Sequence, residues 1–84
     1  MHVDLIDLRL FVNIVQAGNI TAGARLSHLS LPAASARIRA IEASLGVELL
    51  QRSRRGISPT PAGQALAQHA RLLLQQVERM NHDL

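Results

Sequence analysis

Five arginines in the middle of this sequence are the side chains best suited to chemistry. They are Arg37, Arg39, Arg52, Arg54 and Arg55. A planar guanidinium group can hold a phosphate, or the O6/N7 edge of guanine, through two parallel hydrogen bonds. The charges of residues 1–31 and of residues 61–84 each sum to zero, so the middle segment carries the whole net charge of +3. This distribution predicts a polyanionic partner.

The other polar side chains form no set typical of catalysis or metal binding. The six acidic residues are scattered, and no Ser/His/Asp set or activated nucleophile can be assembled. The four histidines share no ligand spacing, and there is no cysteine. No signal pattern and no apolar run near the ~20 residues of a membrane span is present. We expect a cytoplasmic protein that is not an enzyme and has no cofactor, metal ion or membrane partner.

Capping signals and apolar spacing predict two helices before residue 28. Asp4 and Asp7 occupy the positions of a capping box, and apolar residues then recur at helical spacing until Gly18. Asn19 is placed to cap a short second helix over about 20–27, whose small residues allow a neighbouring helix to approach closely.

A third helix is predicted over residues 31–45. Ser30 can cap it, Pro32 falls in its first turn, where no N–H is needed, and Gly46 can end it. Its apolar face consists of Leu31, Ala34, Ile38, Ile41 and Leu45, while Pro32, Ala33, Ala36, Arg39, Ala40 and Ala43 point away from that face. A short helix, a turn and a longer helix are typical of a helix-turn-helix, here over about 20–39.

After Gly46 the apolar pattern changes to a period of two, which predicts a β-hairpin over about residues 47–60. The turn of this hairpin carries Arg54 and Arg55. A basic hairpin tip directly after a recognition helix favours a wing that lies along a phosphate backbone. An ordinary solvated turn is the alternative.

The other three arginines of the middle segment have separate interpretations. Arg39 is on the outward side of its helix, which favours a base or phosphate contact over a solvated charge. Arg37 is nearer the core boundary and is either a phosphate contact or an ion-pair partner. Arg52 is expected to brace the hairpin through Glu48 rather than to touch nucleic acid. Since arginine without lysine also follows from genomic base composition, position along the chain is the stronger evidence.

The last segment predicts one long helix over residues 61–84. Thr60 and Pro61 are a typical N-cap and first helical residue. The helix would reach about 36 Å at 1.5 Å per residue, longer than the rest of so small a domain. Its apolar residues recur at spacings of four and three, as in a coiled-coil seam: Leu66, Ala70, Leu73, Val77, Met80 and Leu84. We expect this seam to form a homodimer, although such a stripe can also cover the domain's own core.

Three blocks of sequence occur together and in order: LRLFVNIVQAGNIT at 8–21, SLPAASARIRAIEASLGVELLQR at 30–52, and TPAG with HAR at 60–63 and 69–71. In this combination the chain, from about Leu5 to Arg71, resembles the N-terminal DNA-binding domain of LysR-type transcriptional regulators. The resemblance and the pattern together predict a mainly α fold. Residues 1–60 would form a winged helix-turn-helix, and residues 61–84 a linker and dimerisation helix.

The resemblance also implies sequence-specific binding of double-stranded DNA by a bacterial transcription regulator. The recognition helix, 31–45, would enter the major groove, and the wing would lie on phosphates. The implied contacts are Thr21, Leu31, Pro32, Ser35, Ala36, Arg39, Arg54 and Arg55, to which the charge pattern adds Arg37. A full-length regulator would carry a larger effector-binding domain, absent from this sequence, and would recruit or block RNA polymerase.

The chain departs from the family pattern on the recognition helix. Leu31 stands where glutamine is common, and Ala36 stands where a basic residue is common. Ala22 and Gly23 replace a basic residue and an alanine. With fewer polar groups to read base edges, we expect more use of thymine methyl groups, of Arg39 and of DNA shape.

Two other classes of function remain as alternatives. A helical protein-interaction or dimerisation module without a DNA target would make the basic middle segment incidental. A membrane-surface domain is disfavoured because the arginines cluster partly in a turn and Phe11 is the only aromatic residue.

Overall fold

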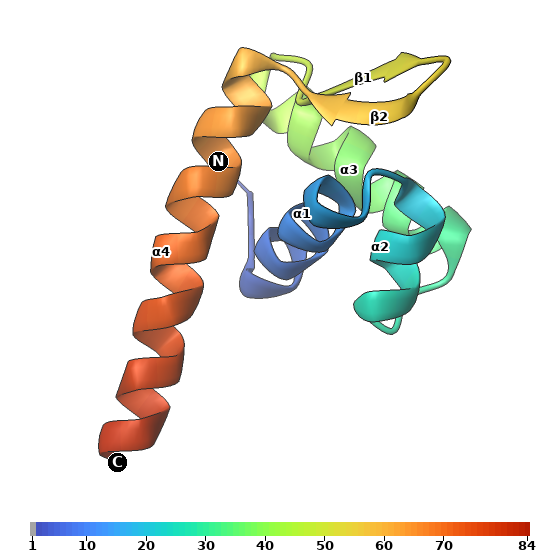
Figure 1. Ribbon diagram of the computed structural model, residues 1–84. Coiled ribbons are helices and arrows are strands. Elements are labelled where there is room, and N and C mark those ends of the chain that lie inside the picture. Colours follow the sequence, from blue (N-terminus) through green and yellow to red (C-terminus); the bar gives the residue numbers. More distant parts are fainter. Residues whose placement is uncertain (1) are drawn as a thin grey trace.

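The computed structural model describes residues 2–84, and Met1, the first residue of the predicted segment 1–60, lies outside them. These residues form four helices and one antiparallel hairpin, and Figure 1 shows how they are arranged. They are α1 (Leu5–Ala17), α2 (Ile20–Leu26), α3 (Leu31–Leu45), β1 (Leu50–Ser53), β2 (Gly56–Pro59) and α4 (Pro61–Asp83). The mainly α, winged helix-turn-helix architecture is therefore confirmed.

Each helix begins at the N-cap residue that the sequence indicates, namely Asp4, Asn19, Ser30 or Thr60. Asp4 accepts the N–H of Asp7 at 2.8 Å, and the Asp7 carboxylate accepts the N–H of Asp4 at 3.2 Å, which completes the capping box. Gly18 ends α1 at φ 78°, a left-handed conformation that favours glycine. Because α1 stops there, the chain can turn directly into α2.

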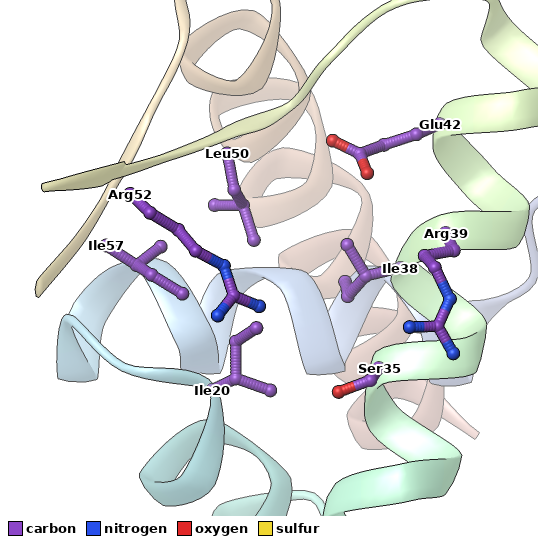
Figure 2. A pocket seen from close by; sticks show the side chains of 8 residues that line it. All are labelled: Ile20, Ser35, Ile38, Arg39, Glu42, Leu50, Arg52 and Ile57. Atoms are coloured by element: carbon purple, nitrogen blue, oxygen red, sulfur yellow. The ribbon is translucent and has the colours of Figure 1, made fainter.

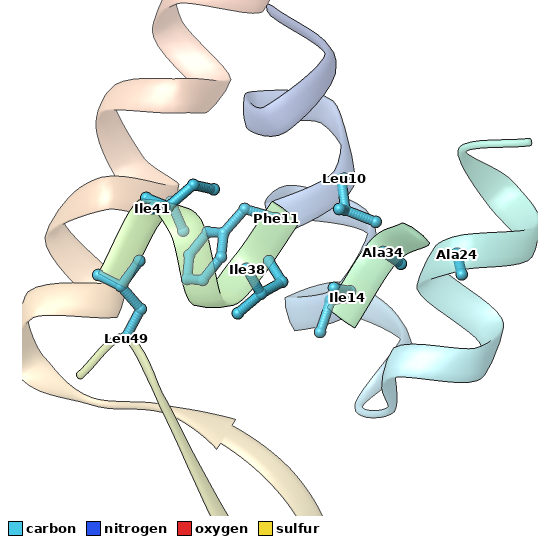
Figure 3. Close-up of a cluster of buried hydrophobic side chains, with 9 residues drawn as sticks. Leu10, Phe11, Ile14, Ala24, Ala34, Ile38, Ile41 and Leu49 are labelled. Carbon is cyan, nitrogen blue, oxygen red and sulfur yellow. The ribbon is translucent and has the colours of Figure 1, made fainter. Parts of the chain in front are cut away.

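The core is built around α1, which packs against α2, α3 and α4. Leu10, Phe11 and Ile14 of this helix are fully buried. Figure 3 shows them among the other buried members of the cluster, Ala24, Ala34, Ile38, Ile41 and Leu49, and Ala67 of α4 completes it. The short α2 approaches α1 closely at Gly23, where a Cβ atom would lie only 2.7 Å from the Ile14 Cα.

One member of the apolar face predicted for α3 is not in the core. Ala34, Ile38 and Ile41 are buried and Leu45 is partly buried, but Leu31 is 47% exposed. Leu31 is the first residue of the helix, and helical side chains point back toward the N-terminus. Its side chain therefore extends past the end of the packed face and into solvent.

The hairpin is shorter than predicted, because residues 47–49 form no strand. The Glu42 carboxylate instead accepts the N–H of Leu49 at 2.7 Å, while the side chain of Leu49 enters the core. The Leu49 carbonyl accepts the N–H of Thr60 at 3.0 Å, and the Gly18 carbonyl accepts the N–H of Ile57 at 3.2 Å. These bonds fix the base of the wing to α3, to α4 and to the turn after α1.

The far half of α4 extends beyond α1 on the side away from the wing, as Figure 1 shows. This projection makes the molecule elongated, with extents of 44 × 25 × 20 Å. No helix within residues 2–84 is long and apolar enough to cross a membrane.

The first turn of α4 depends on the absence of a side chain at Gly63. A Cβ atom there would overlap the Leu49 carbonyl oxygen and lie 3.1 Å from the Pro59 Cβ. Gly63→Ala should therefore destabilise the fold by about 1–3 kcal/mol, measured by urea unfolding. Helix propensity alone predicts the opposite sign, since Gly to Ala in an unhindered helix stabilises it by about 1 kcal/mol.

The matched control is Gln64→Ala, an exposed change in the same turn of α4. It should alter the unfolding free energy by no more than about 0.5 kcal/mol. A stabilised Gly63→Ala protein would show that the close approach to Leu49 does not constrain the fold.

Candidate nucleic-acid interface

The solvent-facing side of α3 presents two rows of side chains, because residues four apart lie above one another on a helix. Leu31, Ser35 and Arg39 form one row, and Pro32 and Ala36 begin the other. All except the half-buried Ser35 are exposed. Ser35 and Arg39 are the polar side chains among these five residues, so this face combines a narrow polar strip with an apolar surface.

A hollow of about 140 Å³ lies between α3 and the wing. Figure 2 shows that Arg39 approaches it from α3 and Arg52 from β1, and that Arg52 reaches toward Ile20 at the start of α2. Ser35 and Glu42 also line this hollow. Two guanidinium groups from different elements thus lie beside the outward face of α3.

The tip of the wing presents two further arginines to solvent. Arg54 and Arg55 form the two-residue turn between β1 and β2, and both are exposed. The Ser53 hydroxyl accepts the N–H of Arg55 at 3.2 Å and shapes this turn. Thr21, in the first turn of α2, is exposed as well and follows Ile20, which lines the hollow.

Arg37 forms an ion pair, which is one of the two roles that the sequence allows for it. Its guanidinium group lies 2.9 Å from the buried Asp7 carboxylate and 3.5 Å from that of Asp4, so it joins α3 to the start of α1. The hydrogen bond to Asp7 raises the pKa of Arg37. The pKa of Asp4 is lowered, first by the backbone N–H of Asp7 and then by the charge of Arg37. A DNA contact by Arg37 stays a prediction.

For Arg52, the predicted ion pair with Glu48 is wrong, and its expected lack of contact with nucleic acid is untested. Within residues 2–84 it forms no ion pair with Glu48. The prediction assumed a strand from residue 47, which would place both side chains on one face, but β1 begins only at Leu50. Alternation within β1 puts Arg52 on the face of Leu50, and both line the hollow beside α3. The period of two already places Leu50 and Arg52 on one face, but it does not show that this face borders α3.

The seam predicted on α4 divides into two parts. Ala70 is 0% exposed and packs with Leu8 and Val12 of α1, while the partly buried Leu66 also packs on the core. These two residues therefore serve the protomer's own core, and the expectation that Ala70 contacts a second copy is wrong. The later seam residues are accessible: Leu73, Met80 and Leu84 are exposed and Val77 is partly exposed. Leu72, which the seam did not include, is exposed too.

Comparison with known proteins gives consistent matches in sequence and in structure. Residues 5–64 match the family described as bacterial regulatory helix-turn-helix protein, lysR family. The nitrogen assimilation regulatory protein nac of Escherichia coli is 42% identical over 72 residues, which cover 86% of this chain and 24% of that protein. The Hca operon transcriptional activator HcaR of Escherichia coli is 41% identical over 76 residues, 90% of this chain and 26% of that protein.

Solved structures of similar proteins include complexes with DNA. A CbnR DNA-binding domain in complex with DNA has a TM-score of 0.86 and 38% identity, covering 96% of this chain and 93% of that one. A BenM DNA-binding domain with catB site 1 DNA has a TM-score of 0.89 and 34% identity, covering 95% and 89%. This chain spans about a quarter of the curated relatives that it matches. With the family's sequence pattern over residues 5–64 and the fold of its DNA-binding domains, the chain belongs to the lysR family of bacterial regulatory helix-turn-helix proteins.

Proposed function

We propose that this chain is the module of a bacterial transcription regulator that binds double-stranded DNA in a sequence-specific manner. The observation that carries the proposal is the arrangement of α3, whose outward face is bordered by arginines from α3 and from the wing. The DNA complexes of the CbnR and BenM domains support it. The relatives are named as regulators, and we propose a role in occupancy of DNA rather than in catalysis.

In this proposal α3 enters the major groove, which is about 12 Å wide and admits one helix. Short side chains such as Pro32 and Ala36 let the backbone of α3 approach the base edges. Leu31, Ser35 and Arg39 then face the bases, and Thr21 contacts the adjoining backbone from α2. Arg37 joins α3 to α1 through its ion pair with Asp7, and a phosphate contact by its remaining guanidinium N–H groups stays part of the proposal.

The wing contacts the phosphate backbone beside the groove. Arg54 and Arg55 are exposed at its tip, and its base is fixed by the hydrogen bond from Ile57 to Gly18. Arg52 lines the same hollow as Arg39, so we add Arg52 to the proposed set of phosphate contacts. Contacts of this kind position a protein on the duplex without reading its sequence.

A second part of the proposal is a homodimer formed through the far half of α4. Leu73, Met80 and Leu84 are exposed apolar side chains on a helix that projects away from the domain. Two α3 helices in such a dimer would reach half-sites about 34 Å apart, or a multiple of that distance. In a complete cytoplasmic regulator, bound DNA would place the protein where it recruits or blocks RNA polymerase.

A protein-interaction module without a DNA target is the competing function, and salt dependence separates the two. Binding to mixed duplex DNA should show a steep log-log salt slope for the parent. Arg54→Ala/Arg55→Ala should make the slope shallower by about 1 to 2 units, since each lost phosphate contact removes about 0.9. Arg39→Ala should relax base preference instead. Fluorescence anisotropy across a salt series measures the slope, and the same method on duplexes that differ at single base pairs measures the base preference.

The matched control is Arg71→Ala/Arg79→Ala, which removes the same charge from exposed positions on α4. Its slope should stay close to that of the parent. Equal slopes for all of these proteins, with weak binding throughout, would favour the protein-interaction module and contradict the DNA interface.

The dimer has its own test in Met80→Glu. Met80 is 55% exposed in the protomer, so the change should leave the fold intact while placing an unpaired charge in the interface. We expect the dimer dissociation constant to rise by about tenfold or more, measured by analytical ultracentrifugation. Gln75→Glu, an exposed position off the seam, adds the same charge and should leave the dimer intact. A monomeric parent, or an unchanged dimer in Met80→Glu, would exclude this interface.

A further inference from the structure

The N-terminal turn of α3 has an unusual surface for a helix that reads base edges. Leu31 is 47% exposed, and Pro32, Ala33 and Ala36 beside it are exposed too. Ser30, the residue before this turn, uses its hydroxyl to accept the N–H of Ala33 at 3.2 Å. The end of the helix that comes closest to the bases in helix-turn-helix proteins is therefore apolar in this chain.

An apolar side chain discriminates between base pairs in a definite way. In the major groove guanine, adenine and cytosine present hydrogen-bonding groups, whereas thymine adds a 5-methyl group. A leucine placed against the polar groups would remove water from them without replacing its hydrogen bonds, which is unfavourable. Placed against a methyl group, the same leucine buries apolar surface on both sides.

We propose that Leu31 and Ala36 read the 5-methyl groups of thymines, so that the half-site takes thymine at the positions facing the first two turns of α3. The proposal rests on the DNA-binding function given above and specifies its readout. Arg39 lies two turns further along the row of Leu31 and is the side chain on this face able to bind guanine bidentately. The half-site therefore places thymine and guanine at opposite ends of the contacted segment.

The positive charge around this apolar face, and the hollow next to it, favour DNA over a protein as its partner. The face continues directly into the hollow lined by Ser35, Arg39 and Arg52. Arg39 and Arg52 border the same face, so an apolar partner protein that covered it would meet a rim of positive charge. A duplex supplies both the phosphates for that rim and the methyl groups for the apolar surface.

The test removes single methyl groups from the DNA. Duplexes that bind this chain are first selected from a random pool, and each enriched thymine is then replaced by deoxyuridine, which lacks only the 5-methyl group. We expect binding to weaken about fourfold at each contacted thymine, the value for one buried carbon. Replacement of thymines outside the selected site should have no effect.

A variant links the effect to its side chain. Leu31→Ala should abolish the difference between thymine and deoxyuridine at one position and keep it at the position facing Ala36. Because Leu31 is exposed, the variant should keep the parent's circular dichroism and its salt slope on mixed DNA. These two readouts separate loss of the methyl contact from loss of the fold.

The outcomes distinguish this inference from the function on which it rests. Selected duplexes that bind equally well with thymine and deoxyuridine would overturn the methyl readout and leave sequence-specific binding in place. A pool in which no sequence is enriched, together with weak and salt-insensitive binding, would overturn both.

Discussion

The packing of α3 on α1 decides which residues of this chain can read DNA. Ala34, Ile38 and Ile41 lie against the buried side chains of α1, so the rotation of α3 about its axis is fixed. Successive helical residues are about 100° apart, and a shift by one residue would turn Arg39 into the buried position of Ile38 and Ile41 into the exposed position of Ala40. The ion pair between Arg37 and Asp7 lies at the edge of this packed face and supports the same rotation.

The position of the wing also depends on α3, through hydrogen bonds. The Glu42 carboxylate, on α3, accepts a hydrogen bond from the N–H of Leu49. The Leu49 carbonyl in turn accepts one from the N–H of Thr60 at the start of α4. Thr60 also donates its hydroxyl hydrogen to the Glu48 carbonyl at 2.6 Å. The recognition helix, the wing and the long helix therefore meet at one set of hydrogen bonds. This junction leaves no room for a side chain at Gly63, and it keeps Arg52 of the wing beside the outward face of α3.

The sequence predicted local structure well because local structure follows from neighbouring residues. N-caps such as Asp4 and Thr60 act within four residues, and both were found from the pattern alone. The predictions that are wrong concern which neighbouring elements a side chain contacts, because those elements are distant in the sequence. The helical wheel placed Leu31 on the apolar side but could not show that the packed face ends before the first turn. The heptad spacing of α4 does not indicate that Ala70 packs on α1 of the same protomer. The predicted ion pair between Arg52 and Glu48 is absent because β1 begins only at Leu50, so Glu48 is not part of the strand that carries Arg52.

One face of α3 and the tip of the wing together form the surface that we propose binds DNA. Titration of the isotope-labelled protein with a selected duplex, followed through backbone amide NMR shifts, tests it directly. The largest shifts should fall on residues 31–39 and 54–56, with small changes over α1 residues 5–10 and the end of α4. Shifts concentrated on α1 or α4 instead, with α3 and the wing unchanged, would contradict this DNA-binding surface.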